Sequence, residues 1–168
     1  MLKTRYLIAA LLGSTAIASA AYAATQTVTA NIKFDTPLTI TKNSDINFGY
    51  VKAATAGKYV VNTAGTVTAS NGGVSLGGTT QAGSLTISGS PTQAIDISAG
   101  NYVANNGVTP SAATCAYNGG PASACLLNSQ PAPGAGKTLL LGVTAAVNGT
   151  QAAGTSAAPS FDVVVNYH

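Results

Sequence analysis

The stretch SFDVVVNY, residues 160–167, decides the fold class. Every second residue in it is a large apolar or aromatic one, which is the period of a β-strand with one buried face. Asp162, Val164 and Asn166 lie on the opposite face. The face predicted to point inward consists of Phe161, Val163, Val165 and Tyr167.

Similar short runs precede this stretch and predict a β-sandwich. They are separated by Gly-Gly and Asn-Gly steps, which supply the positive φ of tight turns. No segment keeps apolar residues at helical spacing over three turns, so little helix is expected. The fold class predicted is all-β, an antiparallel immunoglobulin-like β-sandwich of seven or more short strands. The runs are Thr27–Phe34, Leu38–Thr41, Ile46–Phe48, Lys58–Asn62, Gly65–Ala69, Val74–Leu76, Ser84–Ser88, Ala94–Ser98, Lys137–Val147 and Phe161–Tyr167.

One domain over residues 37–168 is expected, with a long loop over 100–136. This stretch is rich in Gly, Pro, Ser and Asn and shows little alternation. Weak strands are predicted only around Tyr102–Val103 and Leu126–Leu127.

The composition excludes most function classes. Only 7% of the 168 residues are charged, against about 25% in an average protein. Without Lys3 and Arg5 the net charge falls from +3 to 5 − 4 = +1, so no basic patch for nucleic acid is expected. The ionisable acid–base groups are too scattered for a catalytic or metal site, and a Ser–His–Asp set would need an arbitrary choice of partners. They are Asp35, Asp45, Asp96, Asp162 and His168. A non-enzymatic protein without a cofactor is therefore predicted.

Residues 1–23 are predicted to be a signal peptide. Lys3 and Arg5 form a basic region, an apolar run follows, and Ala21-Tyr22-Ala23 fits the A-x-A cleavage rule. The apolar run is interrupted at Gly13, well short of the roughly 20 residues of a membrane span. The mature chain, from about Ala24, is expected to be exported.

Cys115 and Cys125 are the only cysteines, with nine residues between them. In an oxidising compartment two cysteines usually form a disulfide, and the intervening Gly119-Gly120-Pro121 can turn the chain back. Closing so short a loop stabilises the fold by about 2–3 kcal/mol. Two cysteines and one distant histidine would leave a zinc ion without enough ligands.

Two motif matches have simpler explanations. The stretch PAPGAGKT, residues 131–138, is close to a phosphate-binding loop, but it begins with Pro and precedes TLLLGVTAAV, which is typical of a strand. We interpret it as a loop before a strand and expect no nucleotide. Asn148-Gly149-Thr150 matches the glycosylation sequon, and we interpret it as a turn.

The alternating N-terminal segment, within residues 24–36, has two interpretations. In subunits of surface fibres, an extended arm of one copy fills a missing-strand groove in the next. Alternatively, the first and last runs are ordinary edge strands of one closed sandwich. The face of the arm that would be donated consists of Val28, Ala30, Ile32 and Phe34.

Four stretches carry a resemblance to a known family: ANIKFDTPLTITKNSDINFG (30–49), AGTVTAS (64–70), AGSLTISG (82–89) and the C-terminal run 139–168. The chain resembles domain-of-unknown-function family 4402, secreted domains of Gram-negative bacteria that begin P-[LI]-T-I-T and end F-x-V-T-V-x-Y. An insertion between Asn148 and Gln151 and the link Ser156–Ser160 depart from that pattern, and the cysteine pair is not part of it.

More distantly, the layout is similar to the spore-coat-U-type subunits of archaic chaperone–usher pili. This resemblance implies an exported structural subunit that reaches the periplasm and then the cell surface of a Gram-negative bacterium. Its partners would be copies of itself or related subunits, a periplasmic chaperone and an outer-membrane usher. The strand that lines the groove and contacts the chaperone would map onto Phe161, Val163, Val165 and Tyr167.

A rival hypothesis is a stand-alone secreted or surface-bound sandwich that binds a ligand through loop 100–133. Binding residues are often carried by loops on a rigid scaffold. Because aromatic side chains dominate binding hot spots, Tyr102 and Tyr117 are the candidate anchors.

Overall fold

The computed structural model describes residues 24–168, and the predicted signal peptide, residues 1–23, lies outside them. The described chain contains twelve β-strands and no helix. The strands are β1 (Thr39–Ser44), β2 (Asn47–Val51), β3 (Ala56–Val61), β4 (Val67–Ser70), β5 (Ser75–Gln81), β6 (Gly83–Ser88), β7 (Ile95–Val103), β8 (Val108–Tyr117), β9 (Ser123–Ala124), β10 (Leu126–Gln130), β11 (Lys137–Asn148) and β12 (Ser160–Tyr167).

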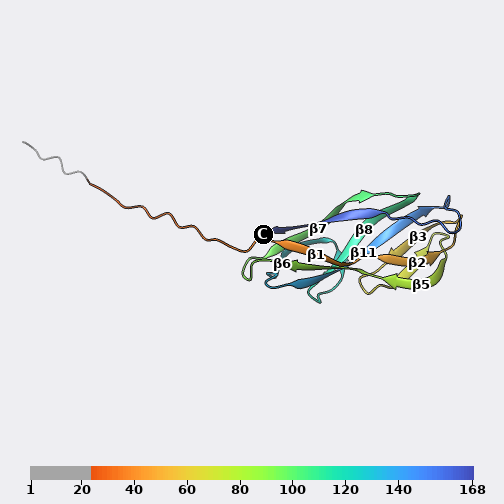
Figure 1. Ribbon diagram of the computed structural model, residues 1–168, viewed down its shortest axis with the longest axis horizontal. Helices are drawn as coiled ribbons and strands as arrows, with labels where there is room; N and C mark the ends of the chain where they lie inside the picture. The colour runs from red at the N-terminus through yellow and green to blue at the C-terminus, as the bar shows by residue number, and fades with distance from the viewer. Residues whose placement is uncertain (1–23) are drawn as a thin grey trace, which may run out of the picture. The chain divides into compact units, whose positions relative to one another are not determined.

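All strand pairs are antiparallel, and β11 organises the larger sheet (Figure 1). The first half of β11 pairs with β6, its second half pairs with β3, and β8 runs along its other edge. The outer strands β1, β4 and β9 complete this seven-stranded sheet. A second sheet has the order β10-β7-β12, and β2 and β5 form a separate ribbon.

The core consists of the inward faces of the two larger sheets. Ile87 of β6 and Leu139 of β11 are fully buried, as is Ile95 of β7 in the opposite sheet. Along β6 buried and partly exposed residues alternate, as expected for a strand with one face on the core. The predicted all-β antiparallel sandwich is confirmed.

The prediction of a loop over 100–136 is wrong. The stretch contains the end of β7, all of β8, and β9 and β10. The sequence pattern predicts only the weak strands near Tyr102–Val103 and Leu126–Leu127, which lie in β7 and β10. In β8 two residues stand opposite one residue of β11, and the extra residue Ala112 has φ +48°. Such a bulge breaks the period-two pattern, and the small residues of β8 give little hydrophobic contrast on either side of it.

Several local predictions are confirmed. β3 and β4 form a hairpin, and Asn62 closes its turn because its side-chain oxygen accepts hydrogen bonds from the backbone N–H groups of Ala64 and Thr66. Residues 131–136 precede strand β11, not a helix. Asn148 and Thr150 form a turn, with hydrogen bonds of 3.1 and 2.8 Å from the Thr150 N–H and hydroxyl to the Asn148 side chain.

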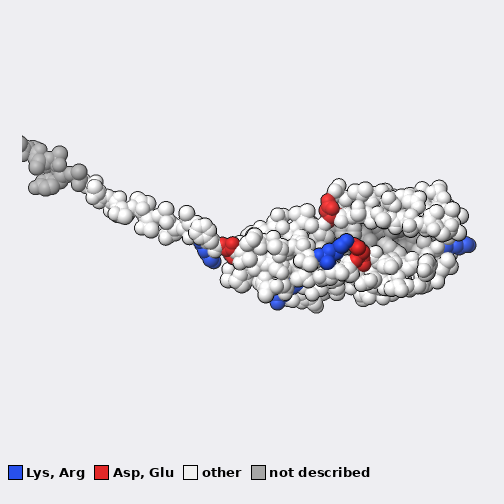
Figure 2. All heavy atoms as spheres, viewed as in Figure 1, with Lys and Arg blue, Asp and Glu red and all other residues white. Residues whose placement is uncertain are grey.

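The visible surface carries few charges (Figure 2). Lys42 and Asp45 form an exposed ion pair of 2.9 Å at the end of β1. Most other side chains on this face are uncharged, which follows from the 7% charged composition.

Candidate functional site

β12 is an edge strand with an apolar face. It pairs with β7 and with no other strand of the described chain. Its inward side chains pack against the core but are only half-buried, whereas Ile95 and Ile97 of the neighbouring β7 are 0 and 1% exposed. The inward position of the predicted face is confirmed for Phe161, Val163, Val165 and Tyr167. One edge of β12 therefore has no hydrogen-bonded strand beside it, and the side chains on its inward face are not fully covered.

The N-terminal arm, residues 24–36, belongs to no strand of the described sheets. The run Thr27–Phe34, predicted as a strand, is therefore not paired within this chain. Val28, Ile32 and Phe34 are 87, 77 and 90% exposed. Ala30, the remaining residue of the predicted donor face, is also exposed. Burying one large side chain of this kind stabilises by roughly 1.5–3 kcal/mol. Docking of the arm against an apolar surface would therefore be favourable.

The last two residues of the arm, Asp35 and Thr36, are fixed by a hydrogen-bonded cluster. Asp35 accepts hydrogen bonds of 2.8 Å from the Ser90 hydroxyl and from the Gln93 side-chain amide. The Tyr167 hydroxyl donates to the Thr36 carbonyl and accepts a 2.6 Å hydrogen bond from the Ser90 N–H. Thr36 is therefore held at the C-terminal end of β12.

This cluster was missed at the level of sequence because its members are far apart along the chain. The one local signal is Ser90-Pro91-Thr92, in which the Ser90 hydroxyl also accepts hydrogen bonds from the N–H groups of Thr92 and Gln93. Ser90 is fully buried, so each of these polar contacts is protected from water.

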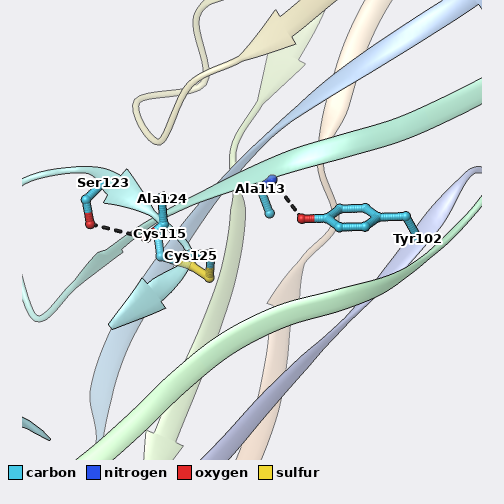
Figure 3. The surroundings of a disulfide bond; sticks show 6 residues. All are labelled: Tyr102, Ala113, Cys115, Ser123, Ala124 and Cys125. Atoms are coloured by element: carbon cyan, nitrogen blue, oxygen red, sulfur yellow. Dashed lines mark hydrogen bonds between the residues drawn. A yellow bond between two sulfur atoms is a disulfide. The ribbon is translucent and has the colours of Figure 1, made fainter. Parts of the chain in front are cut away.

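The predicted disulfide between Cys115 and Cys125 is confirmed (Figure 3). Their Cα atoms are 4.8 Å apart. The Cys125 N–H donates a 2.9 Å hydrogen bond to Ala113 of β8, and its carbonyl accepts a 3.0 Å hydrogen bond from the N–H of Ala99 in β7. Cys125 thus lies between the two sheets, and the disulfide fixes it to β8 of the larger one.

The two candidate anchors Tyr102 and Tyr117 do not lie in a loop. Tyr117, at the end of β8, is 4% exposed, and its hydroxyl donates to the Pro131 carbonyl at 3.1 Å. Burial raises the pKa of the Tyr117 phenol. Because Tyr117 is a core residue, the prediction that it anchors a ligand at the surface is wrong.

Tyr102 belongs to β7 and is 38% exposed. Its ring centroid is 5.7 Å from that of Phe161 in β12. Its hydroxyl accepts a 2.9 Å hydrogen bond from the Ala113 N–H of β8, as Figure 3 shows. Tyr102 therefore links the two sheets near the start of β12 while part of its ring remains at the surface.

Ser129, His168 and Asp96 form a cluster that no pattern in the sequence indicates. The Ser129 hydroxyl lies 3.0 Å from His168 Nε2, and His168 Nδ1 lies 3.1 Å from both Asp96 oxygens. The backbone N–H of Ser129, together with His168, lowers the pKa of the Asp96 carboxyl. The order of contacts matches a Ser–His–Asp triad.

The setting of this cluster is open surface, because the His168 and Asp96 side chains are 55 and 37% exposed. Catalytic triads rely on a site that excludes water and stabilises an oxyanion. Here the Ser129 N–H is engaged by Asp96. The evident role of the contacts is to join β10, β7 and the chain end after β12.

Other site types find little support in the described residues. Within residues 24–168 no group of three or more His, Cys, Asp or Glu side chains is arranged to hold a metal ion. No helix of this part of the chain is long and apolar enough to cross a membrane.

Comparison with known proteins gives one family. The model of a domain of unknown function, DUF4402, matches residues 38–167. The match begins one residue before β1 and ends with the last residue of β12, so it covers the sandwich and excludes the arm. No curated protein and no solved structure gives a significant match.

Proposed function

We propose that this chain, which belongs to the DUF4402 family, is a non-enzymatic structural subunit of a surface fibre assembled by strand addition. After export, the arm of one copy would lie along β12 of the next copy. A periplasmic chaperone would cover the β12 edge before assembly, and an outer-membrane usher would order the subunits. The resemblance of the sequence layout to spore-coat-U-type subunits supports the same assignment.

One observation carries the proposal: the same chain contains an apolar segment that pairs with no sheet and a sheet edge that has no neighbouring strand. The arm has an exposed alternating apolar face, and β12 has an unpaired edge with a half-buried apolar face. Joining them would form a new row of backbone hydrogen bonds, as in other cases of β-augmentation. Burying Val28, Ile32 and Phe34 would contribute roughly 5–9 kcal/mol before the cost of ordering the arm.

The competing hypothesis, a secreted sandwich that binds a ligand through loop 100–133, has less support, because residues 100–133 are largely strands and Tyr117 is buried. We therefore retain the fibre subunit alone.

The test is to express residues 24–168 without a chaperone and to follow assembly by size-exclusion chromatography and electron microscopy. We expect rods or ordered polymers. Deleting Ala24–Phe34 is expected to stop polymerisation, and a peptide of Thr25–Phe34 added in trans is expected to keep the truncated protein soluble. A stable monomer that unfolds when the arm is deleted would show that the arm completes its own fold, and the proposal would fail.

A further inference from the structure

The fixed position of Thr36 sets the direction in which an arm can be donated. Thr36 lies at the Tyr167 end of β12. An arm parallel to the acceptor's β12 would bring the donor's Asp35 to that same end, where the acceptor's own Asp35 and Thr36 already lie. An antiparallel arm brings it to the Phe161 end instead. Repeated antiparallel addition gives an open head-to-tail chain of copies.

Asp35 and Thr36, the base of the arm, directly follow the donated residues. The domain that holds them must therefore lie in contact with the copy that accepts the arm. If Phe34 occupies the last position of the groove, beside the acceptor's Phe161, then Thr36 follows two residues later. Two residues span at most about 7 Å. Because Asp35 and Thr36 are held on the donor's own Ser90 and Tyr167, the base of the donor must touch the acceptor near Phe161.

The base of the domain carries a hollow of about 420 Å³ with a mainly apolar lining. We name it the base hollow. It lies where β1 begins, β6 ends and β11 has yet to start, and no charged side chain lines it. Its walls include Thr36, Pro37, Gly89, Pro91, Gly134 and Ala135.

The opposite end of the domain carries an exposed apolar pair. Tyr102 and Val103 end β7 and are 38 and 49% exposed. Val103 is the register partner of Ser160, the first residue of β12, and Tyr102 contacts Phe161. The pair therefore lies at the end of the groove that the donor's base approaches.

We propose, on the basis of the strand-addition function above, that the base hollow of one copy receives Val103 of the next, while the Tyr102 ring stays beside Phe161 and its hydroxyl stays on Ala113. The contact is heterologous, because different surfaces of the same chain meet, and it therefore extends along a fibre without closing. It gives the fibre a second point of attachment beside the arm. Both surfaces are uncharged, so their burial leaves no unpaired charge at the junction.

The experiment uses the mature chain with substitutions on each surface. Val103→Asp places a charge in the contact and is expected to raise the protein concentration needed for polymer formation about tenfold. Leu126→Asp is the matched control, because Leu126 is an exposed apolar residue on the far edge of the same sheet. It is expected to polymerise like the unaltered protein.

A charge pair across the junction tests the contact directly. Ala135→Lys in the base hollow is expected to weaken assembly alone, and the double variant with Val103→Asp is expected to recover it. The inference is overturned if the double variant is no better than Val103→Asp, or if Val103→Asp behaves like Leu126→Asp while arm deletion still abolishes polymers. If the unaltered protein forms no polymer, both this inference and the proposed function fail.

Discussion

Replacing Tyr167 with Phe is the sharpest test of how the arm is fixed. The substitution removes one oxygen atom and keeps the ring that packs against the core. The lost hydroxyl accepts the 2.6 Å hydrogen bond from the Ser90 N–H and donates to the Thr36 carbonyl. No other contact of the side chain needs to change.

The expected loss of stability follows from the burial of the two partners. Ser90 is fully buried, so its N–H would be left without an acceptor, at a cost of about 1–3 kcal/mol. Thr36 is exposed, so water can replace the lost donor to its carbonyl. We expect the free energy of unfolding to fall by about 2 kcal/mol. For a domain of this size that lowers Tm by about 4–8 °C.

The measurement is urea and thermal unfolding of the arm-deleted chain, so that polymerisation does not interfere. Tyr50→Phe is the control, because Tyr50 is 72% exposed and the loss of its hydroxyl leaves no buried group without a hydrogen-bond partner. A Tyr167→Phe protein as stable as the Tyr50→Phe protein would contradict the assignment of Tyr167 as the fixing residue of the arm's base.

Three further changes have definite expected outcomes. Replacing Cys115 and Cys125 with Ser is expected to lower the free energy of unfolding by about 2–4 kcal/mol in urea titrations, and reduction of the native protein should match it. Because the pKa of the Asp96 carboxyl is lowered in the fold, its charge stabilises the protein above the unfolded-state pKa, and this contribution is lost as pH falls through the folded-state value. Asp96→Asn should therefore destabilise the protein at pH 7, and the destabilisation should shrink as pH falls below the usual range of an Asp carboxyl; a destabilisation that does not change with pH would refute this. Ile32→Asp should slow polymerisation, followed by light scattering, about tenfold or more relative to Asn31→Asp, because successive residues of an extended arm face opposite ways. Equal rates would remove the assignment of the arm's faces.

The strands with regular alternation could be predicted from the sequence, and the reason is physical. In β6 and β12 more buried and more exposed residues alternate along the strand. The alternation of apolar and polar residues in the sequence therefore indicates which face packs on the core. β8 has no continuous alternation, because the bulge at Ala112 moves its later residues to the other face. The sequence of β8 therefore consists of two short alternating patterns that are out of phase, and such a sequence is typical of a loop.

The contacts around the arm's base could not be predicted, because they join residues that are distant in sequence. Asp35 meets Ser90 across 55 positions, and Thr36 meets Tyr167 across 131. No local pattern records such pairs. The same holds for Ser129 and Asp96, which become neighbours only because β10 and β7 pair.

The two edge strands of the sheet β10-β7-β12 differ in length and regularity, and this difference indicates which edge would pair with another copy. β10 has five residues, and its register with β7 shifts between Leu127 and Gln130, which blunts that edge. β12 has eight residues and keeps a regular register from Asp162 to Tyr167. Edge strands that proteins protect from pairing usually carry bulges, prolines or inward charges. From Asp162 to Tyr167 β12 has none of these, and its one charged residue, Asp162, points outward and accepts a hydrogen bond from Asn101. An edge left regular and apolar in a sheet whose other edge is blunted is the edge at which strand addition would occur.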